Sequence, residues 1–121
     1  MKKETWVVIH AGYYAVSNQG RVRRVKLHNS SRKGGFLKEA FTPRGYAHVG
    51  LSVRQVVSAR YIHHLVAEAF LPPRPKGLQI NHKGGNKKNN RASNLEYVTP
   101  GENVRHAMRL GLCPHMKRRK S

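Results

Sequence analysis

Short runs of apolar and β-branched residues, separated by polar turns, occupy the first sixty residues of the chain. This pattern is typical of short antiparallel strands. A turn signal, Ser17-Asn18-Gln19-Gly20, follows the second run, and the stretch 28–35 is too polar to be buried, which is typical of a loop. The pattern therefore predicts a small antiparallel sheet with strands at residues 6–9, 13–16, 21–25, 36–37, 46–53 and 56–62.

The apolar period changes at Ile62. From there apolar residues recur at helical spacing, which predicts a helix over residues 62–70 with one apolar stripe. Pro72-Pro73 ends that helix, because proline cannot continue the helical hydrogen bonding. Residues 72–77 form a short connector, and we expect a structural boundary there.

A different order of elements follows the connector. Residues 78–82 and 95–98 have the composition of two short strands, and the stretch between them is polar and basic. A helix follows at Thr99-Pro100, because threonine is a good N-cap and proline suits the first helical position. We expect this helix to run to about Leu110 and to end at Gly111.

These elements predict an α+β fold, in which a small N-terminal antiparallel β-sheet region is followed by a helix and a C-terminal ββα unit. The expected division is a β-rich region ending in a helix at residues 1–71, the ββα unit at 72–111 and a basic tail at 112–121. The β-rich region is the expected DNA-binding part, because it carries the basic residues Arg21, Arg23 and Arg24.

The chain holds 24 Lys and Arg against 5 Asp and Glu, which gives a formal net charge of +19. Such an excess repels itself in a compact fold, and it is explained if the partner is a polyanion. Nucleic acid fits, because each phosphate that a cation neutralises releases condensed counterions. The basic residues run along the whole chain, so a tail used only for targeting does not explain them.

The single cysteine, Cys113, excludes an internal disulfide and argues against a cysteine-rich zinc site. No apolar run has membrane-spanning length, and no secretory signal is visible, so no membrane partner is expected. The simplest interpretation is an intracellular protein.

The C-terminal unit holds one histidine and three asparagines that suit phosphodiester hydrolysis. His82 ends a predicted strand and is a candidate general base, because histidine titrates near neutral pH. The amide oxygens of Asn81 and Asn103 are acceptable ligands for Mg²⁺, which prefers oxygen. Asn94 precedes the second strand, and its amide is suited to tying the loop together. The alternative is that these asparagines form turns and that His82 is a surface residue near phosphates.

Several segments together resemble the HNH homing-endonuclease family, whose members have a ββα-metal fold. The resemblance rests on the order and spacing of His63-His64-Leu65-Val66-Ala67-Glu68-Ala69-Phe70, Ile80-Asn81-His82-Lys83, Asn94-Leu95-Glu96-Tyr97-Val98-Thr99 and Glu102-Asn103-Val104-Arg105-His106-Ala107. The N-terminal part, with Trp6, Tyr14-Ala15-Val16-Ser17-Asn18 and Gly20-Arg21-Val22-Arg23, looks like the nuclease-associated modular motif that often precedes HNH units.

The resemblance implies a role for each matching residue. His82 is the base that activates water, and Asn94 is the central asparagine that orients the histidine loop. Asn103 is the helix residue that binds the metal. Asn81 matches a position that is often an aspartate ligand, so its neutral side chain implies weaker metal binding. His106 lies one helical turn after Asn103 and is a further candidate ligand, or a phosphate contact.

The expected function is therefore divalent-metal-dependent hydrolysis of DNA, with Mg²⁺ as the metal and Mn²⁺ fitting the same ligands. The expected DNA contacts are basic residues near the site and on one predicted strand, namely Lys87, Lys88, Arg91, Arg105, Arg21, Arg23 and Arg24. A monomer with one such site would nick double-stranded DNA, and a homodimer would be needed to cut both strands at once.

Two other functions compete with this hypothesis. A nuclease-like module that binds DNA without cutting it would have lost His82 or Asn103, and both residues are present. A basic RNA-binding protein would show a known RNA module, and none is visible. The resemblance further implies a phage- or mobile-element-encoded protein that acts in the cytoplasm of a bacterial host.

Overall fold

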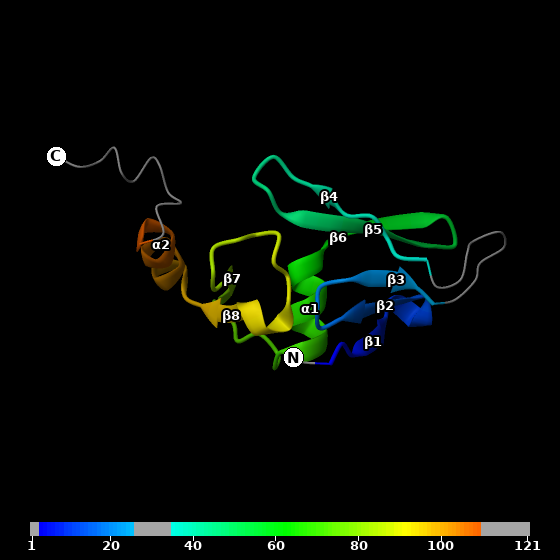
Figure 1. Ribbon diagram of the computed structural model, residues 1–121, viewed down its shortest axis with the longest axis horizontal. Helices are drawn as coiled ribbons and strands as arrows, with labels where there is room; N and C mark the ends of the chain where they lie inside the picture. Colours follow the sequence, from blue (N-terminus) through cyan, green and yellow to red (C-terminus); the bar gives the residue numbers. More distant parts are fainter. Residues whose placement is uncertain (1–2, 26–34, 110–121) are drawn as a thin grey trace.

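A computed structural model of the chain describes residues 3–25 and 35–109. The expected helix end at Leu110-Gly111, the basic tail at 112–121 and nearly all of the loop expected at 28–35 lie outside these residues. Figure 1 shows two small sheets one above the other with a helix beside them, and a separate two-stranded ribbon and a second helix beyond that helix.

The N-terminal β-rich region forms two sheets where the sequence predicted one. The first is antiparallel in the order β1 (Trp6–Ile9), β2 (Tyr14–Ser17) and β3 (Val22–Arg24). A 3-10 turn, His10–Gly12, joins its first two strands. The second is antiparallel in the order β4 (Ala40–Phe41), β5 (Ala47–Val53) and β6 (Val56–Tyr61).

One predicted strand is wrong, and one strand was missed. Phe36 makes only an isolated antiparallel bridge to Arg23, held by hydrogen bonds from the Arg24 amide to the Gly35 carbonyl and from the Leu37 amide to the Val22 carbonyl. The missed strand, β4, has two exposed residues and no apolar alternation. It exists because the turn after it, closed by a hydrogen bond from the Gly45 amide to the Thr42 carbonyl, folds it back onto β5.

The helix α1 (Ile62–Phe70) matches its predicted bounds and carries the core. Its apolar face packs against β2 and β5, which belong to different sheets. The buried cluster takes residues from both sheets, from α1 and from the C-terminal unit: Tyr14, Val16, Val22, Ala47, Val49, Leu51, Ile62, Leu65, Val66 and Leu95. The two parts of the chain therefore share one hydrophobic core.

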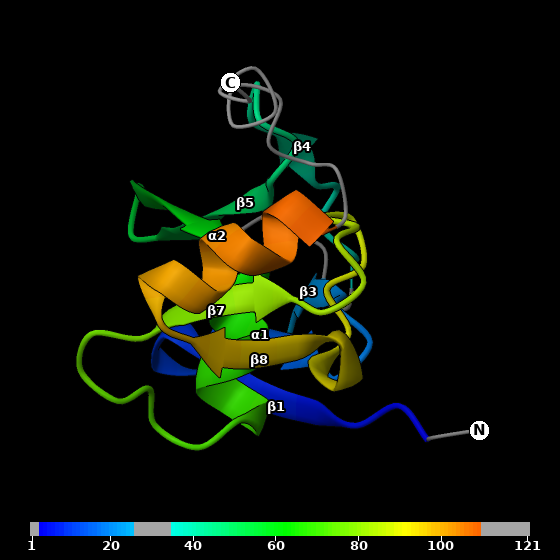
Figure 2. The ribbon, with the colours of Figure 1, turned by 90° about the vertical axis from the view of Figure 1, so that its left-hand side faces the viewer.

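The C-terminal unit has the predicted strand, loop, strand, helix order. The strands β7 (Gln79–His82) and β8 (Leu95–Val98) pair antiparallel, with a 3-10 turn, Ala92–Asn94, just before β8. The helix α2 (Pro100–Arg109) lies across this ribbon (Figure 2). No helix within the described segments is long and apolar enough to cross a bilayer.

Side-chain hydrogen bonds fix the start of α2. The Glu102 amide donates to the Thr99 hydroxyl at 3.1 Å, and the Thr99 amide donates to the Glu102 carboxylate at 2.8 Å. This reciprocal pair is a capping box, and it confirms Thr99 as the cap. Because no residue of α2 is fully buried, the helix depends on such polar contacts more than on apolar packing.

A buried tyrosine joins the two N-terminal sheets. Tyr14 on β2 is 0% exposed, and its hydroxyl accepts a hydrogen bond from the Ser52 amide at 2.8 Å and donates to the Ser52 carbonyl at 3.1 Å. Both backbone groups lie on β5, so a single hydroxyl satisfies a donor and an acceptor on the other sheet.

We expect Tyr14→Phe to lower the free energy of unfolding by about 1–3 kcal/mol, because it leaves two backbone groups without their partner in a part-buried place. Chemical denaturation measures this change. Tyr61→Phe is the matched control, since Tyr61 is largely exposed, and it should cost well under about 1 kcal/mol. Equal effects of the two substitutions would contradict the bridging role.

Candidate active site

The pairing of β7 with β8 sends neighbouring residues to opposite faces of the ribbon. Asn81 is opposite Glu96, and His82 is opposite Leu95. Because side chains alternate along a strand, Asn81 and Glu96 face α2, whereas His82 and Leu95 face α1 and the core. The ribbon therefore presents its histidine and its first asparagine from two sides of the same strand end.

His82 is 5% exposed, and its ring is fixed by one hydrogen bond. Its Nε2 lies 2.8 Å from the side-chain oxygen Oδ1 of Asn90. An amide oxygen only accepts, so Nε2 carries the proton and Nδ1 of the neutral ring keeps its lone pair. Burial lowers the pKa of His82, and the charge of Lys87 lowers it further, while the Asn90 hydrogen bond partly opposes both. A neutral ring with a free nitrogen is the state that a general base needs.

A second histidine packs against this ring. His63, on α1, is 6% exposed, and its ring meets that of His82 edge to face with centroids 5.0 Å apart. The ring of Tyr46 lies 5.4 Å from His63 and 6.2 Å from His82. Burial lowers the pKa of His63 to about 3, and its buried Nδ1 has no hydrogen-bond partner. At neutral pH the His63 ring is therefore uncharged, and it forms one side of the site.

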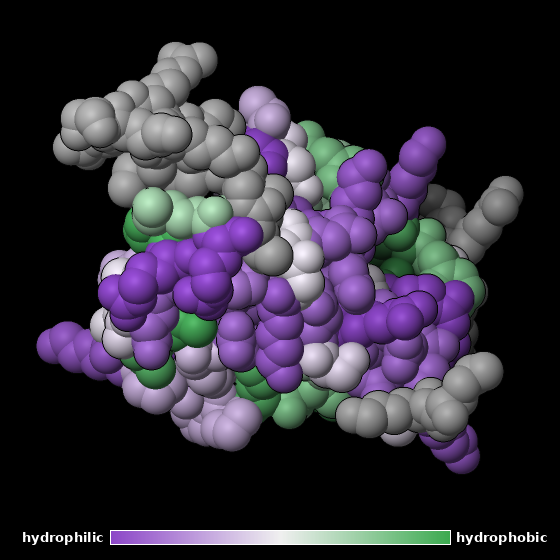
Figure 3. Space-filling model, turned by 60° about the vertical axis from the view of Figure 1, so that its left-hand side comes forward, coloured by the Kyte–Doolittle hydropathy of each residue, from purple (hydrophilic) through white to green (hydrophobic). Residues whose placement is uncertain are grey.

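A cleft of about 240 Å³ opens at the end of β7. It brings together three of the predicted site residues, His82, Asn81 and Asn103, with Lys87 on its rim. The remaining lining residues are Tyr46, Ile80, Gly85, Val104 and Ala107. The face that carries α2 and the ribbon is largely hydrophilic (Figure 3), as expected for a surface that meets a charged partner.

The two candidate metal ligands are oriented by neighbouring acceptors. The Asn81 amide nitrogen donates to the Glu96 carboxylate at 2.8 Å, and the Asn103 amide nitrogen donates to the Gln79 side-chain oxygen at 2.8 Å. Each asparagine thus keeps its own oxygen free for a ligand. Two amide oxygens fit Mg²⁺, which keeps several waters and needs few protein ligands. Residues 3–25 and 35–109 contain no group of three or more His, Cys, Asp or Glu placed to hold a metal ion.

Asn94 ties the loop, as its predicted role requires, but it does so without touching His82. Its side-chain oxygen accepts from the Gly84 amide at 3.1 Å, and its side-chain nitrogen donates to the Asn89 carbonyl at 2.9 Å. Its own carbonyl accepts from the Lys83 amide at 2.7 Å. These three bonds close the loop between β7 and β8.

The residue that touches His82 directly, Asn90, was missed by sequence reasoning. Asparagines in a polar loop are usually turn formers, so residue type alone places Asn90 with Asn86 and Asn89. The structure buries Asn90 to 4% exposure, whereas Asn86 and Asn89 stay partly exposed and make local turn bonds. Nothing in the local sequence separates the three, because the burial of Asn90 comes from residues far away in the chain.

His106 lies beside the cleft and not in its lining. Its Nε2 is 2.8 Å from the Lys83 carbonyl, so this nitrogen carries a proton and is not free to bind a metal. The ring lines a neighbouring hollow with Glu96, Glu102 and Arg105. In this arrangement His106 fastens α2 to the end of β7, and metal binding by His106 stays a prediction that would need Nδ1.

The basic residues predicted to bind DNA are held in different ways. The Arg21 guanidinium is paired with the Glu4 carboxylate, with its Nε at 2.9 Å. Arg23 lies 4.6 Å from the centre of the Trp6 ring, and Arg24 lies 4.9 Å from that of Tyr14. The Arg21 guanidinium also lies over the Trp6 ring, 5.7 Å from its centre, so Arg21 and Arg23 share one face of the first sheet.

The loop lysines also have partners within the chain. The Lys87 ammonium donates to the Arg44 carbonyl at 2.9 Å and lies 4.6 Å from the centre of the Tyr46 ring. The Lys88 ammonium lies 5.3 Å from the Phe41 ring. Arg91 and Arg105 are exposed near the cleft. Contact of any of these residues with DNA stays a prediction.

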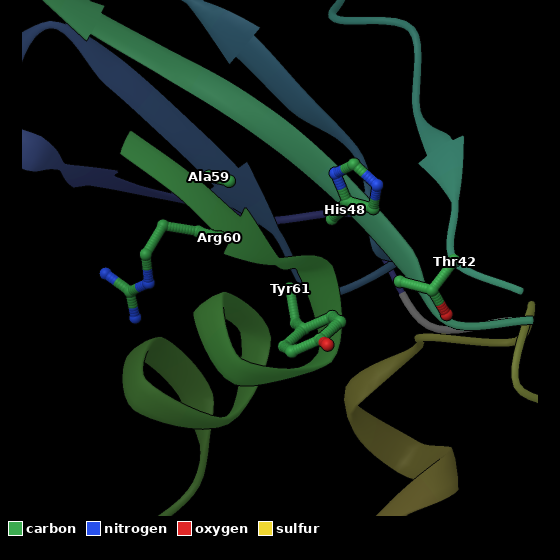
Figure 4. A pocket seen from close by; sticks show the side chains of 5 residues that line it. All are labelled: Thr42, His48, Ala59, Arg60 and Tyr61. Atoms are coloured by element: carbon green, nitrogen blue, oxygen red, sulfur yellow. The ribbon is translucent and has the colours of Figure 1, made fainter. Parts of the chain in front are cut away.

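A second hollow, of about 290 Å³, lies on the outer face of β5 and β6 and is lined by Thr42, His48, Ala59, Arg60 and Tyr61 (Figure 4). The Arg60 side chain extends away from His48 and Thr42 and is paired with Glu68 at 2.6 Å. The polar groups that line this second hollow do not point toward one another, so the cleft at the end of β7 is the candidate active site.

Comparison with known proteins matches both parts of the chain. Residues 60–105 match the HNH endonuclease family, and residues 4–52 match the NUMOD4 motif. The chain is 46% identical over 76 residues to YosQ, an SPbeta prophage-derived protein of Bacillus subtilis (strain 168) named as an HNH homing endonuclease. That match covers 62% of this chain and 44% of YosQ.

The DNA endonuclease I-HmuI of Bacillus phage SP01 is 36% identical over 102 residues, which covers 84% of this chain and 55% of I-HmuI. A solved structure of DNA binding and cleavage by the HNH homing endonuclease I-HmuI superposes with a TM-score of 0.75 at 35% identity. It covers 89% of this chain and 60% of that one. This chain therefore spans about half the length of the curated relatives that it matches, and the α+β fold is shared.

The buried His63 should make the fold acid-sensitive. Its pKa is about 3 in the folded chain and about 6.5 when unfolded, so the unfolded chain binds more protons between these values. The contribution of His63 to the free energy of unfolding is fully present above pH 6.5 and is lost as the pH falls towards 3. We expect the free energy of unfolding to lose roughly 1 kcal/mol per pH unit between pH 6 and 5 from this residue.

Chemical denaturation at pH 7, 6 and 5 measures that slope, and His63→Leu removes the titrating group. The slope should become shallower in the variant without vanishing, because burial also lowers the pKa of His64 and of His82. An unchanged slope would show that His63 is not the group responsible.

Proposed function

We propose that this chain, whose residues 60–105 match the HNH endonuclease family, is a divalent-metal-dependent endonuclease that hydrolyses phosphodiester bonds of double-stranded DNA. The observation that carries the proposal is the cleft that His82, Asn81 and Asn103 line together. It brings an imidazole and two side-chain amides together at the end of one strand.

The reaction requires a water molecule to lose a proton as its oxygen attacks phosphorus. His82 is suited to take that proton on Nδ1, because Nε2 is already committed to Asn90. Asn94 supports the base by closing the loop that holds it. The imidazolium so formed then gives its proton to solvent, which returns His82 to the neutral state.

Asn103 and Asn81 are the residues that would hold the metal, and Mg²⁺ or Mn²⁺ suits their oxygens. Such an ion supplies Lewis acidity for the charge that develops on the phosphate and the leaving oxygen. Asn81 is neutral, so we propose that it binds more weakly than a carboxylate would.

DNA is held, in this proposal, by cations on both sides of the cleft. Lys87 lines the cleft, Lys88 and Arg91 follow in the same loop, and Arg105 lies on α2, whereas Arg21, Arg23 and Arg24 lie on or next to β3 in the first sheet. Contacts of this kind position the phosphate backbone without reading sequence. One site per chain cuts one strand at a time, so a monomer would nick and a homodimer would be needed for a double-strand break.

The relatives from a Bacillus phage and a Bacillus prophage support a phage- or mobile-element-encoded protein acting inside a bacterial host. The competing function is a DNA-binding module without catalysis. The neutral Asn81 and the absence of an acidic or histidine-rich metal cluster among the described residues favour that alternative. Cleavage assays separate the two.

Supercoiled plasmid incubated with the wild type and Mg²⁺ should give nicked circles, and EDTA should abolish them. His82→Ala should lower the cleavage rate by about 100-fold or more, since general-base catalysis contributes on that scale. Gel electrophoresis of the plasmid measures both. Retardation without nicking, on this plasmid and on fragments of a phage genome, would favour the binding module, and full activity in His82→Ala would refute the assigned base.

Replacing Asn81 by aspartate tests whether residue 81 is a metal ligand. The test has to take account of Glu96, whose carboxylate lies next to residue 81. In Asn81→Asp alone, two carboxylates would lie within hydrogen-bonding distance, and their repulsion would make one of them hold a proton. The gain in metal affinity should therefore appear only in the double variant Asn81→Asp/Glu96→Gln.

We expect the double variant to bind Mg²⁺ and Mn²⁺ at least about 10-fold more tightly than the wild type in calorimetric titration. Glu96→Gln alone is the control and should bind no more tightly than the wild type. Equal metal affinity in the double variant and the control would exclude Asn81 as a ligand position.

A further inference from the structure

We infer that the turn between β2 and β3, residues 17–20, belongs to the catalytic apparatus of the proposed nuclease, because it holds Asn90 against His82. Asn90 is then a positioning residue that acts through the base. This inference rests on the proposed function, and it assigns the N-terminal module a second task besides its expected contact with DNA.

The turn is rigid before it touches anything else. Ser17 is 0% exposed, and its hydroxyl accepts hydrogen bonds from the amides of Gln19 at 3.1 Å and Arg21 at 3.2 Å. The Gly20 amide donates to the Ser17 carbonyl at 3.0 Å, and the Ser17 amide donates to the Arg21 carbonyl at 2.8 Å. Four hydrogen bonds thus fix a four-residue turn, which makes it a firm surface for packing.

This turn meets the loop between β7 and β8 at two points. The Asn18 carbonyl accepts a hydrogen bond from the Ala92 amide at 2.8 Å. Gly20 lies directly against Asn90, because a Cβ added to Gly20 would stand 3.1 Å from the carbonyl carbon, the oxygen and the Cβ of Asn90. Glycine is needed at position 20 for two reasons, namely the close approach to Asn90 and the backbone φ of +86°.

Asn90 lies between the turn and the base. It is 4% exposed in a loop that is otherwise polar and that contributes only Ala92 to the edge of the core. On one side Gly20 contacts its backbone, and on the other its oxygen accepts the Nε2 proton of His82 at 2.8 Å. The place of the Asn90 oxygen, and with it the tautomer of His82, therefore depends on a turn some seventy residues earlier in the chain.

The residues involved divide between the two matched families. His82 and Asn90 lie in the HNH match at 60–105, whereas Ser17, Asn18 and Gly20 lie in the NUMOD4 match at 4–52. In this chain the HNH part does not hold its own base without the preceding module.

Gly20→Ala tests the contact, and Gly12→Ala is its matched control. Both glycines have left-handed backbone, with φ of +86° and +89°, so alanine is strained at each. Only Gly20 touches the catalytic loop, because nothing lies within 4 Å of a Cβ at Gly12. We expect kcat for plasmid nicking to fall at least about 10-fold further in Gly20→Ala than in Gly12→Ala, as small misplacements of catalytic groups do. DNA affinity should change equally in both, and equal kcat in the two variants would overturn the inference.

Two substitutions of Asn90 keep the inference testable if Gly20→Ala does not fold. Asn90→Asp keeps an oxygen that accepts the Nε2 proton, whereas Asn90→Leu has similar size and no acceptor. We expect kcat to fall about 100-fold in Asn90→Leu and less than about 10-fold in Asn90→Asp, with little change in KM. A merely structural role predicts the reverse, because a buried carboxylate is harder to accommodate than a leucine.

Nitrogen-15 NMR of the His82 ring separates this inference from the proposed function. The wild type and Gly12→Ala should show Nε2 protonated and Nδ1 unprotonated, and Gly20→Ala and Asn90→Leu should show a mixture of tautomers. A wild type that never cuts DNA would refute the proposed nuclease while the ring signals still report the contact. Identical ring signals in all four proteins would refute the positioning role of the turn.

Discussion

The buried hydrogen bond between His82 and Asn90 is the contact on which the candidate site depends. Burial lowers the pKa of the His82 imidazole and so favours its neutral form, in which one nitrogen donates while the other accepts. The Asn90 oxygen decides which nitrogen donates, and so leaves Nδ1 as the nitrogen able to take a proton. Several parts of the fold hold this pair in place. β7 carries the histidine, and Tyr46 and His63 of α1 pack against its ring. Gly20, at the end of the turn in the first sheet, packs against Asn90.

A chain with a net charge of +19 also has to fold with few carboxylates to neutralise its cations. In the described residues many of the cations are held by aromatic rings and backbone carbonyls instead, as in Arg23 over Trp6 and in Lys87 over Tyr46 and on the Arg44 carbonyl. Rings and carbonyls fix a cation in position without cancelling its charge. The positive field therefore remains available to a polyanion, and Arg21, paired with Glu4, is the member of the predicted set whose charge is most nearly neutralised.

The parts of the fold that depend on local sequence could be predicted, and those that depend on distant contacts could not. The helix at 62–70 and the Thr99 cap follow from apolar spacing and from side chains within one turn of each other. The division into two sheets could not be predicted, because β4 forms only where a turn folds it back onto β5. Asn90 illustrates the same limit within the site: three similar asparagines share one loop, and Gly20, seventy residues away, decides which of them is buried against the base.

The neutral Asn81 raises the question of how the proposed metal site is negative enough to hold a divalent ion. The answer in this chain lies on the neighbouring strand, where the Glu96 carboxylate accepts the Asn81 amide hydrogen at 2.8 Å. A charged acceptor polarises the amide that donates to it, so electron density at the Asn81 oxygen rises. In the proposed metal site the cross-strand pair would divide between two residues what one aspartate does alone: Asn81 would offer the oxygen, and Glu96 would supply the charge. Because the pairing of β7 with β8 brings these two residues directly opposite each other, the same register that directs His82 to the core also sets the electrostatics of the metal side.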